Sequence, residues 1–465
     1  MTSMNKIRFM CLTIAASGSL VFSATQADAQ QAQTLSLSNA VATGVSTNPE
    51  YGEVAASRRA TDEELRQGEA LYLPSVDVRA DTGVEYTDDV GTRGGLDDDD
   101  EETMWRHQEQ LTITQMLFDG WSSKFEVARQ EARVTSAAHR VKETAELIGL
   151  TIVEDYLEVL RQRQLLTIAR QNVQEHLDIL DMIQDGVTGG RSTQADMDQA
   201  RARLAAARAN EASTRQSLRN ADAQYRRDVG DAPGQLELPA VPYESLSSDV
   251  EGEVKGALSH SPTLAIFSSD IEVAYAEAKG TRASFYPQFD LEVNGSNGND
   301  IGGVDGRDTS ASALVVMNWN LYRGGADMAR SREFIHRHQQ TKEARARAAR
   351  DVENDVRQTW ASMIAAGERA KEFAAQVDAN TEVVKAYRDQ FTLDRRTLLD
   401  VLDAQNELYV SRSNAINAEF LEMFAVYRLL ALRGSLLPTL GVEAPRESAV
   451  ASEDTWSTEE KMEAR

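Results

Sequence analysis

The sequence predicts a mainly α-helical protein with a small β part, built from two similar halves. Two segments of roughly 65 to 70 residues, 121–185 and 325–393, contain no proline and have the Ala/Arg/Glu/Gln-rich composition of long helices. At about 1.5 Å per residue, each would form a helix of about 100 Å. Four shorter segments alternate apolar and polar side chains with the period of a strand. The fold class therefore combines very long helices with a small sheet.

The second half of the chain repeats the order of motifs in the first. The paired motifs are Asn48-Pro49 with Ser261-Pro262, Leu73-Pro74 with Tyr286-Pro287, and Leu117-Phe118-Asp119-Gly120 with Leu321-Tyr322-Arg323-Gly324. The first two pairs are 213 residues apart and the third is 204 apart, because a loop of the first half carries an acidic insertion. Solenoid repeats are far shorter. The spacing therefore indicates that a whole half was duplicated.

Residues 1–29 have the pattern of a cleaved secretory signal peptide. A short apolar run follows Lys6 and Arg8, and Ala27-Asp28-Ala29 matches the A-x-A cleavage pattern. A membrane anchor is the alternative, but polar residues interrupt the apolar run. Beyond residue 30, no segment offers the roughly 18 consecutive apolar residues that a membrane-spanning helix needs. Any contact of the exported chain with a membrane is therefore expected through strands.

The composition argues against several classes of function. The formal net charge of -25 excludes non-specific binding to nucleic acid. Cys11 is the only cysteine and lies in the signal peptide, so the mature chain has no thiol chemistry. The six histidines are scattered, and the H-E-x-x-H, P-loop and G-x-S-x-G motifs are absent from the sequence. We therefore predict no catalytic residue, no cofactor and no metal site.

The first structural repeat is expected over residues 30–230. Its expected elements are helices over 36–73, strands at about 75–87 and 105–118, a long helix over 121–185 and a second helix over 193–229. Between its strands lies the run Asp97-Asp98-Asp99-Asp100-Glu101-Glu102. We interpret this run as a solvated outward loop, with binding of divalent cations as the alternative.

The second half follows a linking region at residues 231–256, which contains three prolines. The second structural repeat is expected over residues 257–442. Its expected elements are strands at about 288–295 and 310–322, a polar loop over 294–308, and helices over 325–393 and 397–434. The tail at residues 443–465 is polar and is expected to be disordered.

Four amphipathic strands in an exported chain favour a membrane-embedded barrel. An open sheet leaves backbone groups unpaired at its edges, and lipid offers no water to satisfy them. The strands could close only with those of other copies, which predicts two to four chains and a multiple of four strands. A soluble two-hairpin sheet packed on helices is the alternative. In the membrane case, the helices lie in the periplasm.

Taken in order, the paired motifs and Asp400-Val401-Leu402-Asp403-Ala404 resemble the TolC family of outer-membrane efflux and type I secretion channel proteins. The resemblance covers about residues 34–442. It implies a homotrimer in the cell outer membrane, with a twelve-stranded β-barrel of four strands per chain. A long α-helical coiled-coil barrel would continue it through the periplasm, where most of the chain lies.

The resemblance also implies partners for transport. A periplasmic membrane-fusion adaptor and an inner-membrane ABC or RND transporter would dock to the channel, for type I protein secretion or drug efflux. The sequence leaves the cargo open. A soluble periplasmic coiled-coil adaptor or structural protein is the alternative function.

Asp400 and Asp403 are the candidate residues of the pore entrance. They lie three positions apart at the start of a predicted helix, so their carboxylates share one face. The resemblance implies that they form an acidic ring that favours cations at the periplasmic entrance. The alternative is capping, because Thr397-x-x-Asp400 resembles a capping box, as does Thr193-x-x-Asp196. Capping does not account for Asp403.

The resemblance further implies an aperture gating network. Arg396 matches the family's arginine that helps to hold the entrance closed, and Asp196 matches an acid on the other helix pair. Phe391 departs from the family's best-known channel, which has a hydrogen-bonding tyrosine at this position. Phenylalanine cannot make that bond. Other charged residues, such as Glu175, are expected to be solvated helix faces.

Overall fold

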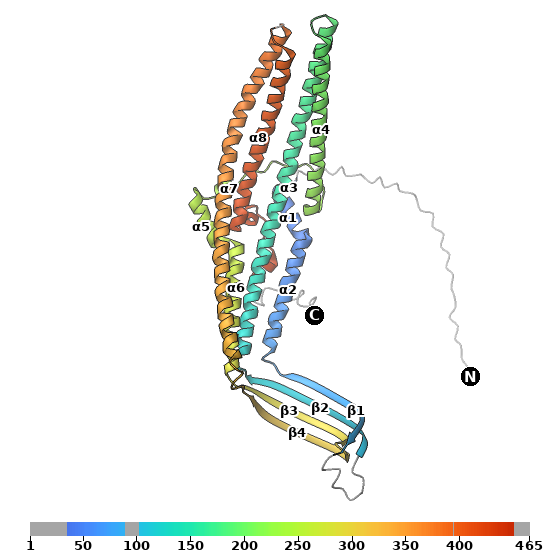
Figure 1. Ribbon diagram of the computed structural model, residues 1–465, viewed down its shortest axis with the longest axis vertical. Helices are drawn as coiled ribbons and strands as arrows, with labels where there is room; N and C mark the ends of the chain where they lie inside the picture. Colours follow the sequence, from blue (N-terminus) through green and yellow to red (C-terminus); the bar gives the residue numbers. More distant parts are fainter. Residues whose placement is uncertain (1–34, 89–101, 394, 451–465) are drawn as a thin grey trace, which may run out of the picture.

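The computed structural model describes residues 35–88, 102–393 and 395–450. Four long helices form an elongated body with a four-stranded sheet at one end (Figure 1). They are α3 (Ser122–Thr188), α4 (Gln194–Val229), α7 (Ala326–Thr392) and α8 (Leu398–Arg433). α3 and α7 each contain 67 residues, which confirms the expected length of about 100 Å.

Shorter helices pack along the half of the body nearer the sheet. They are α1 (Leu37–Thr47), α2 (Pro49–Ala70), α5 (Val250–His260), α6 (Pro262–Gly280) and α9 (Leu436–Thr439). α2 and α6 each begin with a proline, which has no N–H to leave unpaired in the first turn. Asn48 caps α2 by accepting a 2.8 Å hydrogen bond from the backbone N of Glu50. The chain therefore divides into α1 and α2 at Asn48-Pro49.

Among the described helices, none combines the length and the apolar character that a membrane-spanning helix requires.

The sheet is antiparallel, with the order β1-β2-β3-β4. The strands are β1 (Ser75–Thr87), β2 (Glu102–Phe118), β3 (Gln288–Ile301) and β4 (Val304–Asn318). β2 pairs with β3, so the sheet joins the two halves of the chain. β1 and β4 are its two edges, and each pairs with one strand only.

The second hairpin differs from the expectation. β3 continues six residues past the expected end at 295, and β4 begins six residues before 310, so most of the expected loop at 294–308 is strand. The turn is reduced to Gly302-Gly303, both with positive φ. The segment reads as a loop because its residues are polar, but they pair across the hairpin, as in the 2.7 Å contact between the hydroxyls of Ser296 and Ser310. β2 starts at Glu102, three residues early, and β4 ends at Asn318, four residues early.

Near the sheet, the helices keep the order of the strands to which they are joined. α2 leads into β1, β2 leads into α3, α6 leads into β3 through the short 3₁₀ helix η3 (Thr281–Phe285), and β4 leads into α7. α2 packs on α3, α3 on α6, and α6 on α7. In the other half of the body, α3 pairs with α4 and α7 pairs with α8, which makes two long helical hairpins (Figure 1).

The main hydrophobic core lies at mid-height, where these layers meet. Ile152 and Tyr156 of α3 pack with Tyr225 of α4 and Leu430 of α8, and all four are fully buried. The Tyr156 hydroxyl donates to the carbonyls of Leu35 (2.8 Å) and of the linking region, at residue 237 (2.7 Å). The core therefore fixes the N-terminal segment and the linking region to the long helices.

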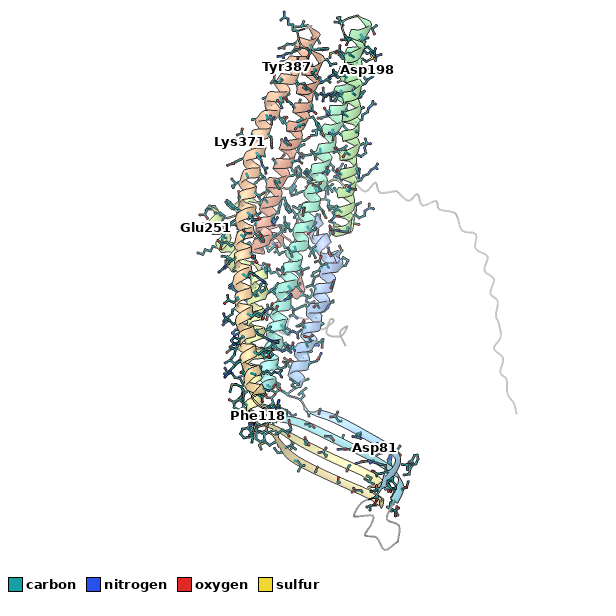
Figure 2. The ribbon with its side chains drawn as sticks, viewed as in Figure 1. Asp81, Phe118, Asp198, Glu251, Lys371 and Tyr387 are labelled. Carbon is teal, nitrogen blue, oxygen red and sulfur yellow. The ribbon has the colours of Figure 1, made fainter. Side chains whose placement is uncertain are left out.

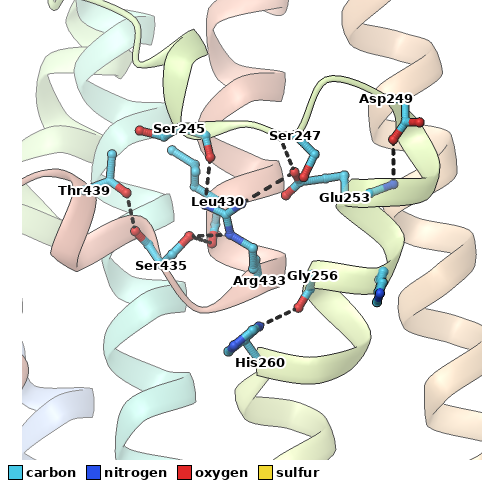
Figure 3. A network of polar contacts seen from close by, with 12 residues as sticks. Ser245, Ser247, Asp249, Glu253, Gly256, His260, Leu430, Arg433, Ser435 and Thr439 are labelled. Atoms are coloured by element: carbon cyan, nitrogen blue, oxygen red, sulfur yellow. Dashed lines mark hydrogen bonds and ion pairs between the residues drawn. The ribbon is translucent and has the colours of Figure 1, made fainter.

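A buried ion pair ties the linking region to the end of α8 (Figure 3). The Glu253 side chain of α5 is fully buried, lies 3.6 Å from Arg433, and accepts a 2.9 Å hydrogen bond from the backbone N of Ser247. Arg433 also donates to the carbonyl of Ser245, at 2.9 Å. Because a buried carboxylate is costly without a partner, this network holds α5 against α8.

The start of the tail has structure that the sequence did not predict. Residues 446–448 form the 3₁₀ turn η4 (Arg446–Ser448), and Glu447 accepts a 2.7 Å hydrogen bond from the Tyr51 hydroxyl. Arg59 lies 3.4 Å from the same carboxylate. The expected disorder of 443–465 therefore does not hold for residues 443–450. The predicted signal peptide, residues 97–101 of the acidic run and residues 451–465 lie outside the described ranges.

Candidate functional site

All five predicted site residues lie at the end of the body remote from the sheet. The turn between α3 and α4 and the turn between α7 and α8 lie close together there, as Asp198 and Tyr387 mark in Figure 2. Asp196 is in the first turn of α4, and Asp400 is in the first turn of α8. We call this end the tip.

Both acidic capping hypotheses are confirmed by the geometry. Thr397 donates to Asp400 Oδ2 through its backbone N (3.2 Å) and its hydroxyl (2.8 Å), and the Asp400 backbone N donates back to the hydroxyl (3.3 Å). Thr193 and Asp196 form the same box at the start of α4. These bonds lower the pKa of both carboxyls. The largest effect comes from the Thr397 side chain for Asp400 and from the Thr193 backbone N for Asp196. Both acids are therefore charged at neutral pH.

Asp403 is not part of the cap and instead contacts the other hairpin. Its Oδ1 lies 3.0 Å from Nη2 of Arg203, which comes from α4. Both side chains are partly open to solvent, with 39% of Arg203 and 55% of Asp403 exposed. The sequence reasoning missed Arg203. α4 and α8 both start at the tip, but only their packing shows that a long arginine on one reaches the acid on the other.

Arg396 makes its contacts within its own hairpin. Its guanidinium lies 4.1 Å from the centre of the Tyr387 ring, and Nε donates to Gln390 Oε1 at 3.0 Å. Asp400 Oδ2 lies 3.9 Å away. Among the described residues of one chain, no hydrogen bond or ion pair joins Arg396 to Asp196.

Phe391 packs in a small apolar cluster at the tip. The buried members of this cluster are Ile179, Ile183, Met197, Ala200, Leu398, Val401 and Leu402, which come from α3, α4 and α8. Phe391 lies against them, partly buried. An aromatic ring without a hydroxyl suits this position, because a buried hydroxyl would need a hydrogen-bond partner.

A second ion pair crosses between the hairpins. Glu175 of α3, which was expected to be part of a solvated helix face, is one-third exposed and pairs with Arg388 of α7. Asn210 of α4 also donates to the Tyr409 hydroxyl of α8, at 2.8 Å.

His176 lies beside these contacts and is only 5% exposed. Burial lowers the pKa of His176, and the positive charges of nearby arginines lower it further. His176 is therefore neutral near pH 7.

The predicted site residues give the tip a charged surface. Across residues 35–88, 102–393 and 395–450, no group of three or more His, Cys, Asp or Glu side chains could hold a metal ion. Asp196 and Asp400 are engaged in caps, and Asp403 contacts Arg203. What the arrangement can do is attract cations and hold two hairpins together through contacts that water can reach.

The chain has clear relatives. The family model described as outer membrane efflux protein matches residues 44–230 and 254–435. The outer membrane efflux protein BepC of Brucella suis is 26% identical over 455 residues, 94% of each chain. The alkaline protease secretion protein AprF of Pseudomonas aeruginosa is 23% identical over 382 residues, 79% of this chain and 78% of its own.

The fold is also shared with a solved structure. The outer membrane protein VceC of Vibrio cholerae superposes with a TM-score of 0.71 at 16% identity, covering 88% of this chain and 97% of its own. The match of the family model confirms the predicted family, and with it the predicted outer-membrane efflux or secretion channel rather than the soluble periplasmic alternative. The chain belongs to the outer membrane efflux protein family.

Proposed function

We propose that the chain assembles as a homotrimer whose three sheets close into one twelve-stranded barrel. The observation that carries this proposal is the open sheet, with β1 and β4 as unpaired edges at opposite sides. If β4 of one copy pairs with β1 of the next, every backbone group at an edge gains a partner. Three copies, rather than two or four, follow from the family resemblance.

The two faces of the sheet support a barrel with a lipid side and a water side. Across the four strands, the row Val76, Ile113, Val293 and Ala313 is apolar, whereas the next row, Asp77, Thr112, Asn294 and Ser312, is polar. Val76 is 62% exposed and Val78 is 76% exposed, which is unusual for valine unless the surface meets lipid or protein. The polar rows would line a water-filled interior.

The helices would continue the barrel as a tunnel through the periplasm, with the tip as its entrance. In a trimer, Asp400 and Asp403 would contribute six carboxylates around that entrance. The cap uses only Oδ2 of Asp400, and 39% of this side chain is exposed, so capping leaves it available to a passing cation. Arg396, Asp196 and Phe391 would form the gating network, with contacts between chains replacing those absent within one chain.

The protein would act as a passive conduit without a catalytic step. A periplasmic membrane-fusion adaptor and an inner-membrane ABC or RND transporter would supply the cargo and the energy. The names of two relatives point to efflux and to secretion of a protease. For this chain, a neighbouring gene for an ABC exporter would indicate protein secretion.

Conductance in planar bilayers tests this function. The purified full-length protein should run as a heat-modifiable trimer that requires detergent, and it should form channels that trivalent cations block from the periplasmic side. The double substitution Asp400→Ala/Asp403→Ala should remove the block. Asp198→Ala is the control, because this exposed acid lies at the tip on α4. Unchanged block in the double variant would reject the acidic entrance, and a soluble chain without conductance would reject the channel.

A further inference from the structure

We propose that Arg203 of α4 masks Asp403 of α8 while the two hairpins are together, and so sets the cation selectivity of the entrance. The inference rests on the proposed acidic entrance and adds a residue that regulates it. When the hairpins separate at the tip, Asp403 loses this partner. The entrance would then become more selective for cations as it opens.

Arg203 and Asp403 are in direct contact. Arg203 Nη2 lies 3.0 Å from Asp403 Oδ1, and Arg203 is the only hydrogen-bond partner of the Asp403 side chain in the described part of the chain. A guanidinium at this distance cancels most of the field that the carboxylate exerts on an ion passing several ångströms away. In this arrangement, Asp403 therefore adds little net charge to the entrance.

The two acids of the proposed ring differ in where their partners lie. The partners of Asp400 are Thr397 and Arg396, which precede it on the same hairpin and move with it. The partner of Asp403 belongs to the other hairpin. Separation of α4 from α8 thus leaves the surroundings of Asp400 unchanged but removes the positive charge beside Asp403. The charge of the entrance is coupled to its geometry through this one pair.

The side chains of Arg203 and Asp403 can separate. Both side chains are substantially exposed, so water and salt weaken their attraction. The other contacts between α4 and α8 are few: the 2.8 Å hydrogen bond from Asn210 to the Tyr409 hydroxyl, and the small apolar cluster at the tip. The buried His176 adds no positive charge near pH 7, because burial keeps it neutral. Arg203 is therefore the cation that directly balances Asp403.

The chain offers matched controls for this role. Arg388 and Glu175 also form an ion pair between the hairpins, but neither belongs to the proposed ring. Arg388→Gln therefore removes a positive charge from between the hairpins while the partner of Asp403 remains in place. Arg203→Lys keeps the positive charge, whereas Arg203→Gln removes it. Because 39% of Arg203 is exposed, neither substitution should prevent folding, and each variant would be checked as a heat-modifiable trimer.

The experiment uses the full-length protein in planar bilayers with hexaamminecobalt(III) as the probe. Arg203→Gln should lower the half-blocking concentration by roughly fivefold or more and shift the reversal potential in a KCl gradient toward that of potassium. Arg203→Lys and Arg388→Gln should stay within roughly twofold of the wild type. In 1 M KCl, where the Debye length is about 3 Å, the difference between Arg203→Gln and the wild type should shrink.

Two results would overturn the inference. An unchanged half-blocking concentration in Arg203→Gln would show that the arginine does not mask Asp403. An equal decrease in Arg388→Gln would show that loss of any positive charge between the hairpins has this effect, and that Arg203 has no particular role. A failure of the proposed entrance itself would give a different result. In that case the double variant Asp400→Ala/Asp403→Ala would be blocked as strongly as the wild type.

Discussion

The middle of the helical body and its tip are held together by different physics. At mid-height, large apolar side chains such as Ile152, Tyr225 and Leu430 are fully buried between several layers of helices. At the tip, only the two hairpins meet, and they are joined by a smaller apolar cluster and by ion pairs that solvent reaches. Burial gives a stable frame, whereas exposed charges give contacts that exchange with water. The middle of the body is therefore its stable part, and the tip is the part whose contacts can break and re-form.

The largest effect is expected from the mid-height core. Ile152→Ala removes a fully buried side chain and should lower the free energy of unfolding by about 2–5 kcal/mol. Guanidinium denaturation in detergent, followed by circular dichroism, would measure it. Leu147→Ala, on the same helix but 56% exposed, should change stability by less than about 0.5 kcal/mol. Equal effects of the two substitutions would remove the distinction between core and surface.

A buried acid, Glu146, makes the stability of the core depend on pH. Burial raises the pKa of Glu146 to about 7, although it accepts a 2.9 Å hydrogen bond from the Leu436 backbone N. The folded state therefore holds a proton that the unfolded chain releases near its ordinary pKa. The stability contributed by this proton is full below that ordinary value and is lost as pH rises through 7.

Glu146→Gln should abolish this part of the pH dependence. Glutamine stays neutral and can still accept from Leu436, so the variant should be more stable than the wild type above pH 7, by on the order of 2–3 kcal/mol. Thermal melting at pH 5 and pH 8 would measure the difference. Parallel pH profiles of the variant and the wild type would contradict the assignment.

A smaller and more local effect is expected from a helix cap at the tip. Thr193→Ala removes the capping box of α4 and should cost about 1 kcal/mol, confined to the first turn of that helix. Amide exchange over residues 194–198 would report it. Thr214→Ala is the control, because this hydroxyl only bonds back to the carbonyl of Asn210. Global destabilisation as large as that of Ile152→Ala would show that the tip is part of the main cooperative unit.

The smallest effect is expected from the ion pair between α3 and α7. Arg388→Gln should lower the free energy of unfolding by about 1 kcal/mol or less, because the pair is partly exposed. The conductance in bilayers should stay within roughly twofold of the wild type, because the contact between Arg203 and Asp403 remains. Arg201→Gln breaks a pair within one helix and should leave the conductance unchanged. A conductance change in Arg201→Gln alone would contradict a role for contacts between the hairpins.

The parts of the fold that could be predicted are those that local sequence determines. Proline and glycine fix the ends of the helices, as at Asn48-Pro49 and Gly434, and long proline-free segments fix their lengths. The second hairpin was underestimated, because the polar residues around Asn294 look like a loop until their partners across the strands are known. The ordered start of the tail depends on Glu447 meeting Tyr51, a contact between distant parts of the chain.

The same limit applies to the candidate site. The caps at Asp196 and Asp400 were predictable because a capping box lies within four consecutive residues. The pairing of Asp403 with Arg203 was not, because it depends on how two helices 200 residues apart pack and which arginine reaches across. The family resemblance located the tip but did not indicate this contact.

Hydrogen exchange of the full-length protein in detergent tests the comparison most directly. We expect the amides at the tip, in residues 176–205 and 385–408, to exchange at least about tenfold faster than those in 148–160 and 420–431 at mid-height. The difference should appear in the resting protein without any partner. Equal protection of the two regions would show that the tip is as rigid as the core, and would contradict its proposed role as an adjustable entrance.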